Sequence, residues 1–202
     1  KVADPIIVHP DVRKMLLTQK AISEGCRAFT YFTTKQIEIS KYAESMEERK
    51  RADDMVVVLT PIVKAFMTET ALDVTNLGIQ VYGGHGYISE HGMEQYYRDA
   101  KIFTLYEGTT GIQALDLLGR KIMQFNHGKL GPLADVVNDF IANNPNNPYT
   151  EELKQYMQQW QELIQTVMTK SMKNMDEMGA ASVDFLMYSG YVLLAYFWAD
   201  MY

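Results

Sequence analysis

The sequence contains almost no cysteine and no excess of basic residues. Its 202 residues include one cysteine, Cys26, so no internal disulfide can form, and this composition is typical of a reducing compartment. The 19 lysines and arginines are outnumbered by 25 aspartates and glutamates, which gives a net charge of −6. Because binding to a phosphate backbone requires a basic surface, the composition argues against nucleic acid as a partner.

The sequence also lacks a long apolar run. The one segment that suggests a membrane, residues 191–199, ends at Asp200, whereas a spanning helix needs about 20 apolar residues. We therefore predict no transmembrane segment and interpret these residues as a buried helix, with an interfacial aromatic anchor as the alternative. The chain begins with Lys1 and shows no charged-then-apolar leader, so we expect a fragment or a processed product rather than a secretory precursor.

Sustained strand-like alternation of apolar and polar residues is absent, so we predict an all-α fold. Apolar residues make up 47% of the chain, which is enough to bury a core. Apolar side chains spaced by three and four positions predict a first helix at residues 10–42, with Pro10 and Asp11 in its first turn. Residues 55–59 form an apolar run that resembles a strand, but we assign them to a second helix at residues 55–81.

The segment between these two helices is highly charged. Residues 44–54 are too polar for a core, and we predict a solvated helix end followed by a connection. Farther along, Thr60 and Pro61 leave two alternatives open: a fresh helix that Thr60 caps, or a kink at Pro61 within one longer helix.

Closely spaced glycines at residues 83–86 interrupt the helical pattern. A helix at about residues 94–103 follows. A turn then leads to a helix that Thr109 or Thr110 caps and that continues to about Ile122.

The composition shifts after Gln124, where glycine and proline become frequent. We predict a short amphipathic helix at residues 133–141, followed by a linker of asparagine and proline at residues 143–148. The predicted architecture is therefore a helical bundle at residues 1–124 and a smaller helical extension at residues 125–202.

Within the extension, the pattern predicts two further helices. Thr150 is expected to cap a long helix of residues 151–178, and Gly179 is expected to end it. A last helix should begin near Ser182.

Glu107 is the residue best suited to acid–base chemistry. It lies between Tyr106 and Gly108 immediately before a predicted helix, so its carboxylate can be held at a bend. Enclosure by apolar surface raises the pKa of a carboxyl group toward neutrality, which makes it a better proton acceptor. From the residues alone, the alternative is an acid that only complements the helix dipole.

Other reactive patterns are incomplete. Gly83, Gly84 and Gly86 lack the lysine and hydroxyl that complete a phosphate-binding P-loop. His85 and His91 match no compact zinc pattern, so we expect no metal site. No serine or cysteine lies in a recognisable nucleophile motif.

Four short motifs occur in a specific order along the chain. They are Lys64-Ala65-Phe66, residues 80–87 (Gln-Val-Tyr-Gly-Gly-His-Gly-Tyr), residues 97–102 (Tyr-Arg-Asp-Ala-Lys-Ile) and residues 106–109 (Tyr-Glu-Gly-Thr). In this order and spacing they resemble the C-terminal domain of acyl-CoA dehydrogenases. Residues 7–13 and the tail through Val192 are similar to the larger bacterial members, which carry an added helical segment, so a bacterial cytoplasmic location is expected.

The resemblance implies an FAD-dependent oxidoreductase. In the complete enzyme, the helical bundle would pack with an N-terminal helical domain and a middle β-domain, neither of which lies in these 202 residues. The implied reaction is α,β-dehydrogenation of an acyl-CoA to the trans-2-enoyl-CoA, in which Glu107 takes the α-proton and hydride leaves the β-carbon for the flavin. The backbone N–H of Glu107 and a ribityl hydroxyl of the flavin would stabilise the thioester oxygen.

The same resemblance implies roles for five other residues. Gly108 would let the substrate approach closely, and Thr109 would contact the flavin. Gln80, Gly83 and Gly84 would also bind FAD, and Gln80 and Gly84 match positions on the adenosine-diphosphate portion of a neighbouring subunit's flavin. A homo-oligomer, either dimer or tetramer, is therefore implied, and electron transfer flavoprotein is the expected electron acceptor.

Two departures and two alternatives remain. Gly111 stands where many relatives have a glutamine near the flavin, and some members place the base on an earlier helix, although Glu107 occupies the commoner position. An acyl-CoA oxidase would share this fold but pass electrons to oxygen, and a non-catalytic helical association module is the alternative from another class. The 202-residue piece alone is expected to be inactive, because it supplies only part of the flavin site.

Overall fold

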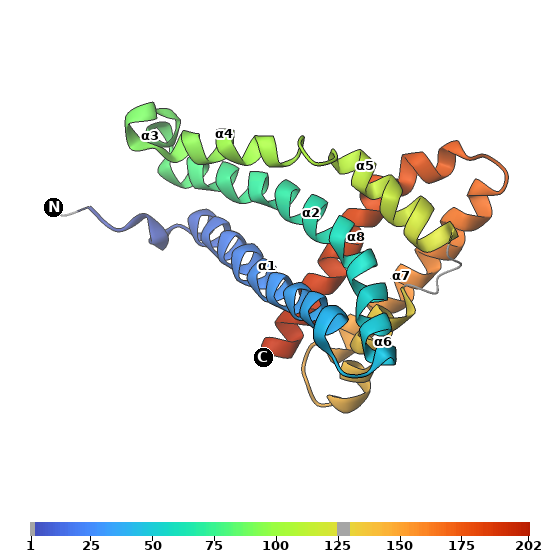
Figure 1. The fold of residues 1–202 in the computed structure, drawn as a ribbon. Helices are drawn as coiled ribbons and strands as arrows, with labels where there is room; N and C mark the ends of the chain where they lie inside the picture. The colour runs from blue at the N-terminus through green and yellow to red at the C-terminus, as the bar shows by residue number, and fades with distance from the viewer. Residues whose placement is uncertain (1–2, 125–129) are drawn as a thin grey trace.

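The computed structural model describes residues 3–124 and 130–202, and these residues form helices and turns without any β-strand. The predicted all-α fold is therefore confirmed. Two long helices, α1 (Pro10–Tyr42) and α2 (Met46–Tyr82), form an antiparallel hairpin after a short 3-10 turn at Ile6–Val8 (Figure 1). The predicted bounds of α1 agree with the structure.

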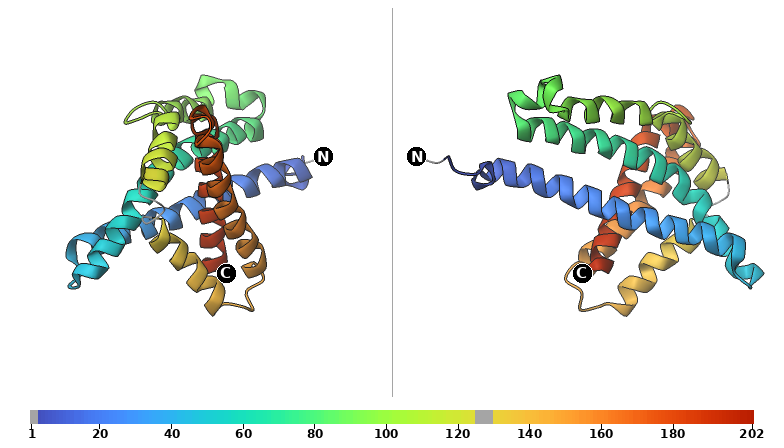
Figure 2. Two further views of the ribbon diagram at one scale, coloured as in Figure 1. Left: turned by 90° about the vertical axis from the view of Figure 1, so that its right-hand side faces the viewer. Right: turned by 60° about the vertical axis from the view of Figure 1, so that its left-hand side comes forward.

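The remaining helices pack around this hairpin. Helix α4 runs back along the second half of α2, and α8 crosses the hairpin, as the rotated views show (Figure 2). After α2 the order is α3 (Gly84–Tyr87), a 3-10 turn (Ser89–His91), α4 (Met93–Phe103), α5 (Thr110–Leu115), a π-helical segment (Asp116–Gln124), α6 (Gly131–Asn143), α7 (Thr150–Ser171) and α8 (Asp176–Met201).

One hydrophobic cluster spans both predicted units. Phe29 of α1 and Phe197 of α8 stack with ring centroids 5.1 Å apart, and Trp160 of α7 is buried in the same cluster. The Trp160 indole donates a hydrogen bond to the Ser189 hydroxyl at 2.8 Å, so this buried polar group is satisfied. The boundary that we predict between residues 124 and 125 adjoins residues 125–129, which lie outside the described residues, and the division into two units stays a prediction.

The charged segment at residues 44–54 differs from the prediction. Helix α2 begins at Met46, so most of this segment forms its first turns. The Ser45 hydroxyl accepts a hydrogen bond from the Glu48 N–H at 3.3 Å, a cap that makes a helix start here favourable. The segment is solvated, as predicted, but the connection is limited to residues 43–45 and the rest belongs to α2.

Pro61 lies inside α2, so the kink alternative is correct. Proline has no N–H to donate to the preceding turn, which leaves a carbonyl free and bends the helix. The Thr60 hydroxyl donates to the Val56 carbonyl at 2.7 Å, a back-bond of the kind that also bends helices, and the ribbon of α2 bends midway along its length (Figure 1).

The tail helix predicted at residues 133–141, the linker after it and the start of the long helix near residue 151 agree with the structure, but the end of that helix and the start of the last one were predicted wrongly. Helix α7 ends at Ser171, and Gly179 lies inside α8 rather than ending a helix. The turn between them is stabilised by Asn174, whose side-chain oxygen accepts from the Asp176 N–H at 3.1 Å. Thr150 does not cap α7 either, since its hydroxyl donates to the Asn144 carbonyl at 2.7 Å.

Two helices are long and apolar enough to cross a membrane by length and composition, namely α2 and α8. In each helix, 44% of the most apolar window is buried inside the protein, and core helices pass the same test, so this is weak evidence for a membrane. Val192, Leu193 and Phe197 of α8 are buried, which agrees with our interpretation of residues 191–199 as a buried helix.

Gly190 allows α8 to approach α2 closely. A Cβ atom at this position would lie 2.2 Å from the ring of Phe66, closer than real contacts allow. The neighbouring Tyr191 ring meets Phe66 edge-on at 5.0 Å. The crossing of these two helices therefore depends on a bare backbone at Gly190.

We predict that Gly190→Ala lowers the thermal unfolding midpoint of the full-length protein, because overpacking a core costs about 1–3 kcal/mol. Differential scanning calorimetry measures the change. Gly179→Ala is the matched control on the same helix, since nothing lies within 4 Å of an added Cβ there and alanine stabilises a helix by about 0.5–1 kcal/mol over glycine. An unchanged midpoint for Gly190→Ala would contradict the close packing.

Candidate active site

The turn between α4 and α5 holds Glu107 in an unusual backbone conformation. Glu107 has a φ of 54°, and among the described residues it is the only non-glycine residue with a positive φ. Gly108 follows with a φ of 94°. A left-handed conformation costs an L-residue about 1–2 kcal/mol, so surrounding contacts must hold Glu107 in place.

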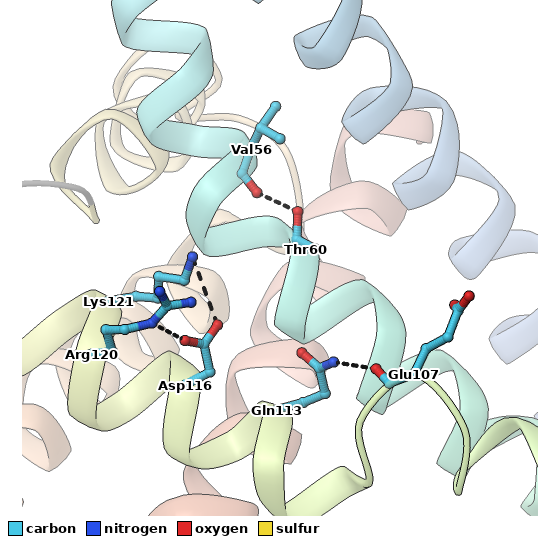
Figure 3. Close-up of polar contacts among 7 residues, drawn as sticks. All are labelled: Val56, Thr60, Glu107, Gln113, Asp116, Arg120 and Lys121. Carbon is cyan, nitrogen blue, oxygen red and sulfur yellow. Dashed lines mark hydrogen bonds and ion pairs between the residues drawn. The ribbon is translucent and has the colours of Figure 1, made fainter.

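Two side chains supply those contacts from different helices. The Gln113 amide of α5 donates to the Glu107 carbonyl at 3.1 Å (Figure 3). The Lys64 ammonium of α2 donates to the Gly108 carbonyl at 2.5 Å. Both carbonyls of the left-handed pair are therefore anchored to the protein.

The turn also carries amide N–H groups that can donate hydrogen bonds. In a trans peptide the N–H points opposite to the preceding carbonyl, so the N–H groups of Gly108 and Thr109 point away from Gln113 and Lys64. Among the residues that the structure describes, no acceptor bonds the N–H groups of Glu107, Gly108 or Thr109. The turn thus offers hydrogen-bond donors beside a carboxylate.

The Glu107 side chain itself is exposed. Its carboxylate points away from Gln113 and from the ion pairs that Asp116 forms with Arg120 and Lys121 (Figure 3). The apolar enclosure that we expected around Glu107 is not formed by the described part of this chain. Exposed apolar side chains do flank the turn, and they are Ile102, Phe103, Leu105, Tyr106, Ile112 and Leu115.

Gln80, Gly83 and Gly84 lie at the far end of α2 and are exposed. Gly83 ends α2 with a φ of 60°, which other residues rarely adopt, and its N–H donates to the Gln80 carbonyl at 3.1 Å. Nothing lies within 4 Å of a Cβ built on Gly83 or Gly84, so their backbone is open to a ligand.

The structure brings some of the predicted site residues together and separates others. Glu107, Gly108 and Thr109 form one turn between α4 and α5, whereas Gln80 and the two glycines lie where α2 meets α3. Figure 1 shows α3 and α5 at opposite ends of α4. At a rise of 1.5 Å per residue, the length of α4 corresponds to about 16 Å. These are therefore two distinct surfaces of one chain.

Neither threonine caps α5 through its side chain, which corrects the prediction. Thr109 occupies the N-cap position without a side-chain hydrogen bond. The Thr110 hydroxyl donates to the Glu69 carboxylate of α2 at 2.5 Å. Lys64 and Glu69 thus join α2 to both flanks of the turn, and we predicted neither contact from the sequence. The sequence feature that could have pointed to Lys64 is the Lys-Ala-Phe motif to which it belongs.

The sequence matches described protein families over most of its length. Residues 2–123 match the family "Acyl-CoA dehydrogenase, C-terminal domain". The chain belongs to the acyl-CoA dehydrogenase family. Residues 133–202 match a second description, "Acetyl-CoA dehydrogenase C-terminal like".

Curated relatives agree with this assignment. The chain is 49% identical over 122 residues to 3-methylmercaptopropionyl-CoA dehydrogenase of Ruegeria pomeroyi, a match that covers 60% of this chain and 21% of that protein. It is 40% identical over 147 residues to a butyryl-CoA dehydrogenase of Syntrophomonas wolfei, covering 73% of this chain and 24% of that protein. The chain therefore spans less than a quarter of the length of these relatives.

The fold is also found in a solved structure. The crystal structure of Caenorhabditis elegans ACDH-11 in complex with C11-CoA superimposes with a TM-score of 0.72 over 95% of this chain and 33% of that one. The sequence identity is 20%, so this likeness concerns the fold alone. It includes the tail as well as the bundle.

We predict that Gly108→Ala breaks the Gln113 anchor. An alanine at a φ of 94° is strained, and its Cβ would lie 2.9 Å from the Gln113 amide nitrogen. A crystal structure of the full-length variant should show the Gln113 amide displaced from the Glu107 carbonyl. Gly111→Ala is the control, because nothing lies within 4 Å of its added Cβ. Retention of the Gln113 contact in Gly108→Ala would contradict this explanation of Gly108.

Proposed function

We propose that the full-length protein containing this chain is an FAD-dependent acyl-CoA dehydrogenase, and that Glu107 is its catalytic base. The observation that supports this most is the anchored left-handed turn, which presents a carboxylate and free N–H groups side by side. Removal of an α-proton from a thioester needs both features at once. The carboxylate accepts the proton, and N–H donors stabilise the negative charge that develops on the thioester oxygen.

Glu107 would perform both tasks. Its carboxylate takes the α-proton of the acyl chain, while its backbone N–H donates to the thioester oxygen. Gly108 has no side chain, so the substrate can lie against the turn. Closing apolar surface around Glu107 would remove water from its carboxylate and favour proton uptake, and the exposed apolar residues beside the turn are suited to such a closure.

The residues present fit a bound FAD. Thr109 is exposed beside Glu107, where its hydroxyl can contact the flavin of its own active site. Gln80, Gly83 and Gly84 offer an exposed amide and open backbone, which suits the adenosine-diphosphate portion of the cofactor. When bound, FAD supplies the hydride-accepting chemistry that no side chain can provide.

A homo-oligomer is part of the proposal. Gln80 and Gly84, which lie about the length of α4 from Glu107, would contact the flavin of a neighbouring subunit, as the resemblance implies. Electron transfer flavoprotein is the proposed acceptor of the electrons, and the bacterial cytoplasm is the proposed location. The unpaired Cys26 thiol, half-buried with a pKa raised by burial, is compatible with that location.

Anaerobic mixing of the full-length protein with acyl-CoAs of different chain length tests the proposal. Loss of the oxidised flavin absorbance is expected in the wild type and not in Glu107→Gln, which removes the base while keeping the side-chain size. The control is Glu44→Gln, an exposed acid before α2 that should bleach like the wild type.

Each outcome of this experiment is informative. Equal bleaching of wild type and Glu107→Gln would place the base elsewhere. Rapid reoxidation of the reduced wild type by oxygen, with release of hydrogen peroxide, would identify an oxidase. A full-length protein that holds no flavin would favour the helical association module.

A further inference from the structure

Helix α2 directs Lys64 at the turn that carries Glu107. Pro61, one turn before Lys64, lies at the bend of α2, and the two residues after Lys64, Ala65 and Phe66, are fully buried. The backbone at Lys64 is therefore fixed by core packing on one side and by the bend on the other. The Lys64 side chain extends from this fixed backbone to the turn that carries Glu107.

The contact between Lys64 and the turn is a strong one. The half-buried ammonium donates to the Gly108 carbonyl at 2.5 Å, and a charged donor strengthens a hydrogen bond relative to a neutral one. In the part of the chain that the structure describes, no carboxylate lies within ion-pair distance of Lys64. Among the described residues, the Gly108 carbonyl is thus the acceptor of the hydrogen bond from the Lys64 ammonium.

Two neighbouring contacts also hold the turn in its conformation. Gln113 holds the Glu107 carbonyl from α5, and Glu69 holds the Thr110 hydroxyl from α2. Rotation of the Gly108 peptide would break the Lys64 contact and turn the Thr109 N–H inward. The Lys64 contact therefore opposes relaxation of the left-handed pair to an ordinary turn.

We propose that Lys64 is a positioning residue for the catalytic base, acting through the Gly108 carbonyl. This inference rests on the proposed function of Glu107. Lys64 does not touch the reacting atoms. It keeps the Glu107 carboxylate and the adjacent N–H groups in the arrangement that proton removal requires, because a small misplacement of a base lowers the rate of the chemical step more than it lowers substrate binding.

Lys64→Met removes the donor and the charge but keeps an unbranched side chain. Stopped-flow flavin reduction in the full-length protein should show a rate constant at saturating acyl-CoA that is lower by roughly 10-fold or more, the loss expected for a hydrogen bond to a charged group. The acyl-CoA concentration at half-saturation and the flavin content should change less than about 2-fold, since uniform binding is not affected. Lys64→Arg, which retains donors and charge, should recover part of the rate.

Lys50→Met is the matched control on the same helix. The Lys50 ammonium is exposed and bonds the Asp54 carboxylate at 2.7 Å on the surface, so its removal should leave the reduction rate unchanged. A merely structural role of Lys64 predicts a different pattern, in which flavin content and substrate affinity fall together with the rate.

The outcomes separate this proposal from the proposed function. Bleaching by Glu107→Gln refutes the base assignment whatever Lys64 does. A reduction rate of Lys64→Met equal to that of the wild type, with Glu107→Gln inactive, overturns the role of Lys64 alone. If Lys64→Met holds no flavin, the test passes to Lys64→Arg. A wild-type reduction rate in Lys64→Arg, with no contact between the introduced guanidinium and the Gly108 carbonyl in the crystal structure of that variant, overturns the proposal. A reduced rate in Lys64→Arg with unchanged acyl-CoA affinity supports it.

Discussion

The packing of the Phe66 ring against the bare backbone of Gly190 is the constraint on which the rest of the structure depends. It fixes α8 across α2, and the rigid α2 then carries Lys64 only two residues before Phe66. One helix thus has a core face and a face toward the active-site turn. The conformational strain of Glu107 is offset by contacts that originate in the best-packed part of the protein, which is how strained functional residues persist.

At the turn of residues 107–109, the hydrogen bonds that anchor the backbone also decide which backbone groups can bind a ligand. Lys64 and Gln113, from different helices, donate hydrogen bonds to two successive backbone carbonyls. Because the N–H of a trans peptide points opposite to its carbonyl, the N–H groups of these two peptides face away from the anchoring side chains. The lack of a side-chain cap at Thr109 leaves the N–H groups in the first turn of α5 without that acceptor as well.

Much of the fold could be predicted because helical periodicity is strong in this chain. The bounds of α1 and the break at Gly83 follow from local signals, since apolar spacing and a left-handed cap depend on few residues. The tail was harder to predict. Gly179 resembles a helix end, but Asn174 already forms the turn, and an isolated glycine is tolerated inside α8 because packing along the rest of that helix outweighs its propensity.

The candidate site could be predicted only in part. The resemblance points to Glu107, and the structure shows its conformation, which no local pattern encodes because the positive φ is imposed by contacts from α2 and α5. Lys64 precedes the turn by 44 positions, so sequence spacing gives no sign of their contact. The apolar enclosure expected from the sequence is not formed by the described residues, which leave the Glu107 side chain exposed.

A crystal structure of the full-length protein with FAD and an unreactive acyl-CoA analogue tests the central claim most directly. The account predicts that the Glu107 carboxylate lies about 3–3.5 Å from the α-carbon and that its N–H bonds the thioester oxygen. It also predicts that Thr109 contacts the flavin of its own subunit and Gln80 that of a neighbour. A different carboxylate beside the α-carbon, with Glu107 directed into solvent, would contradict the assignment of Glu107 as the base.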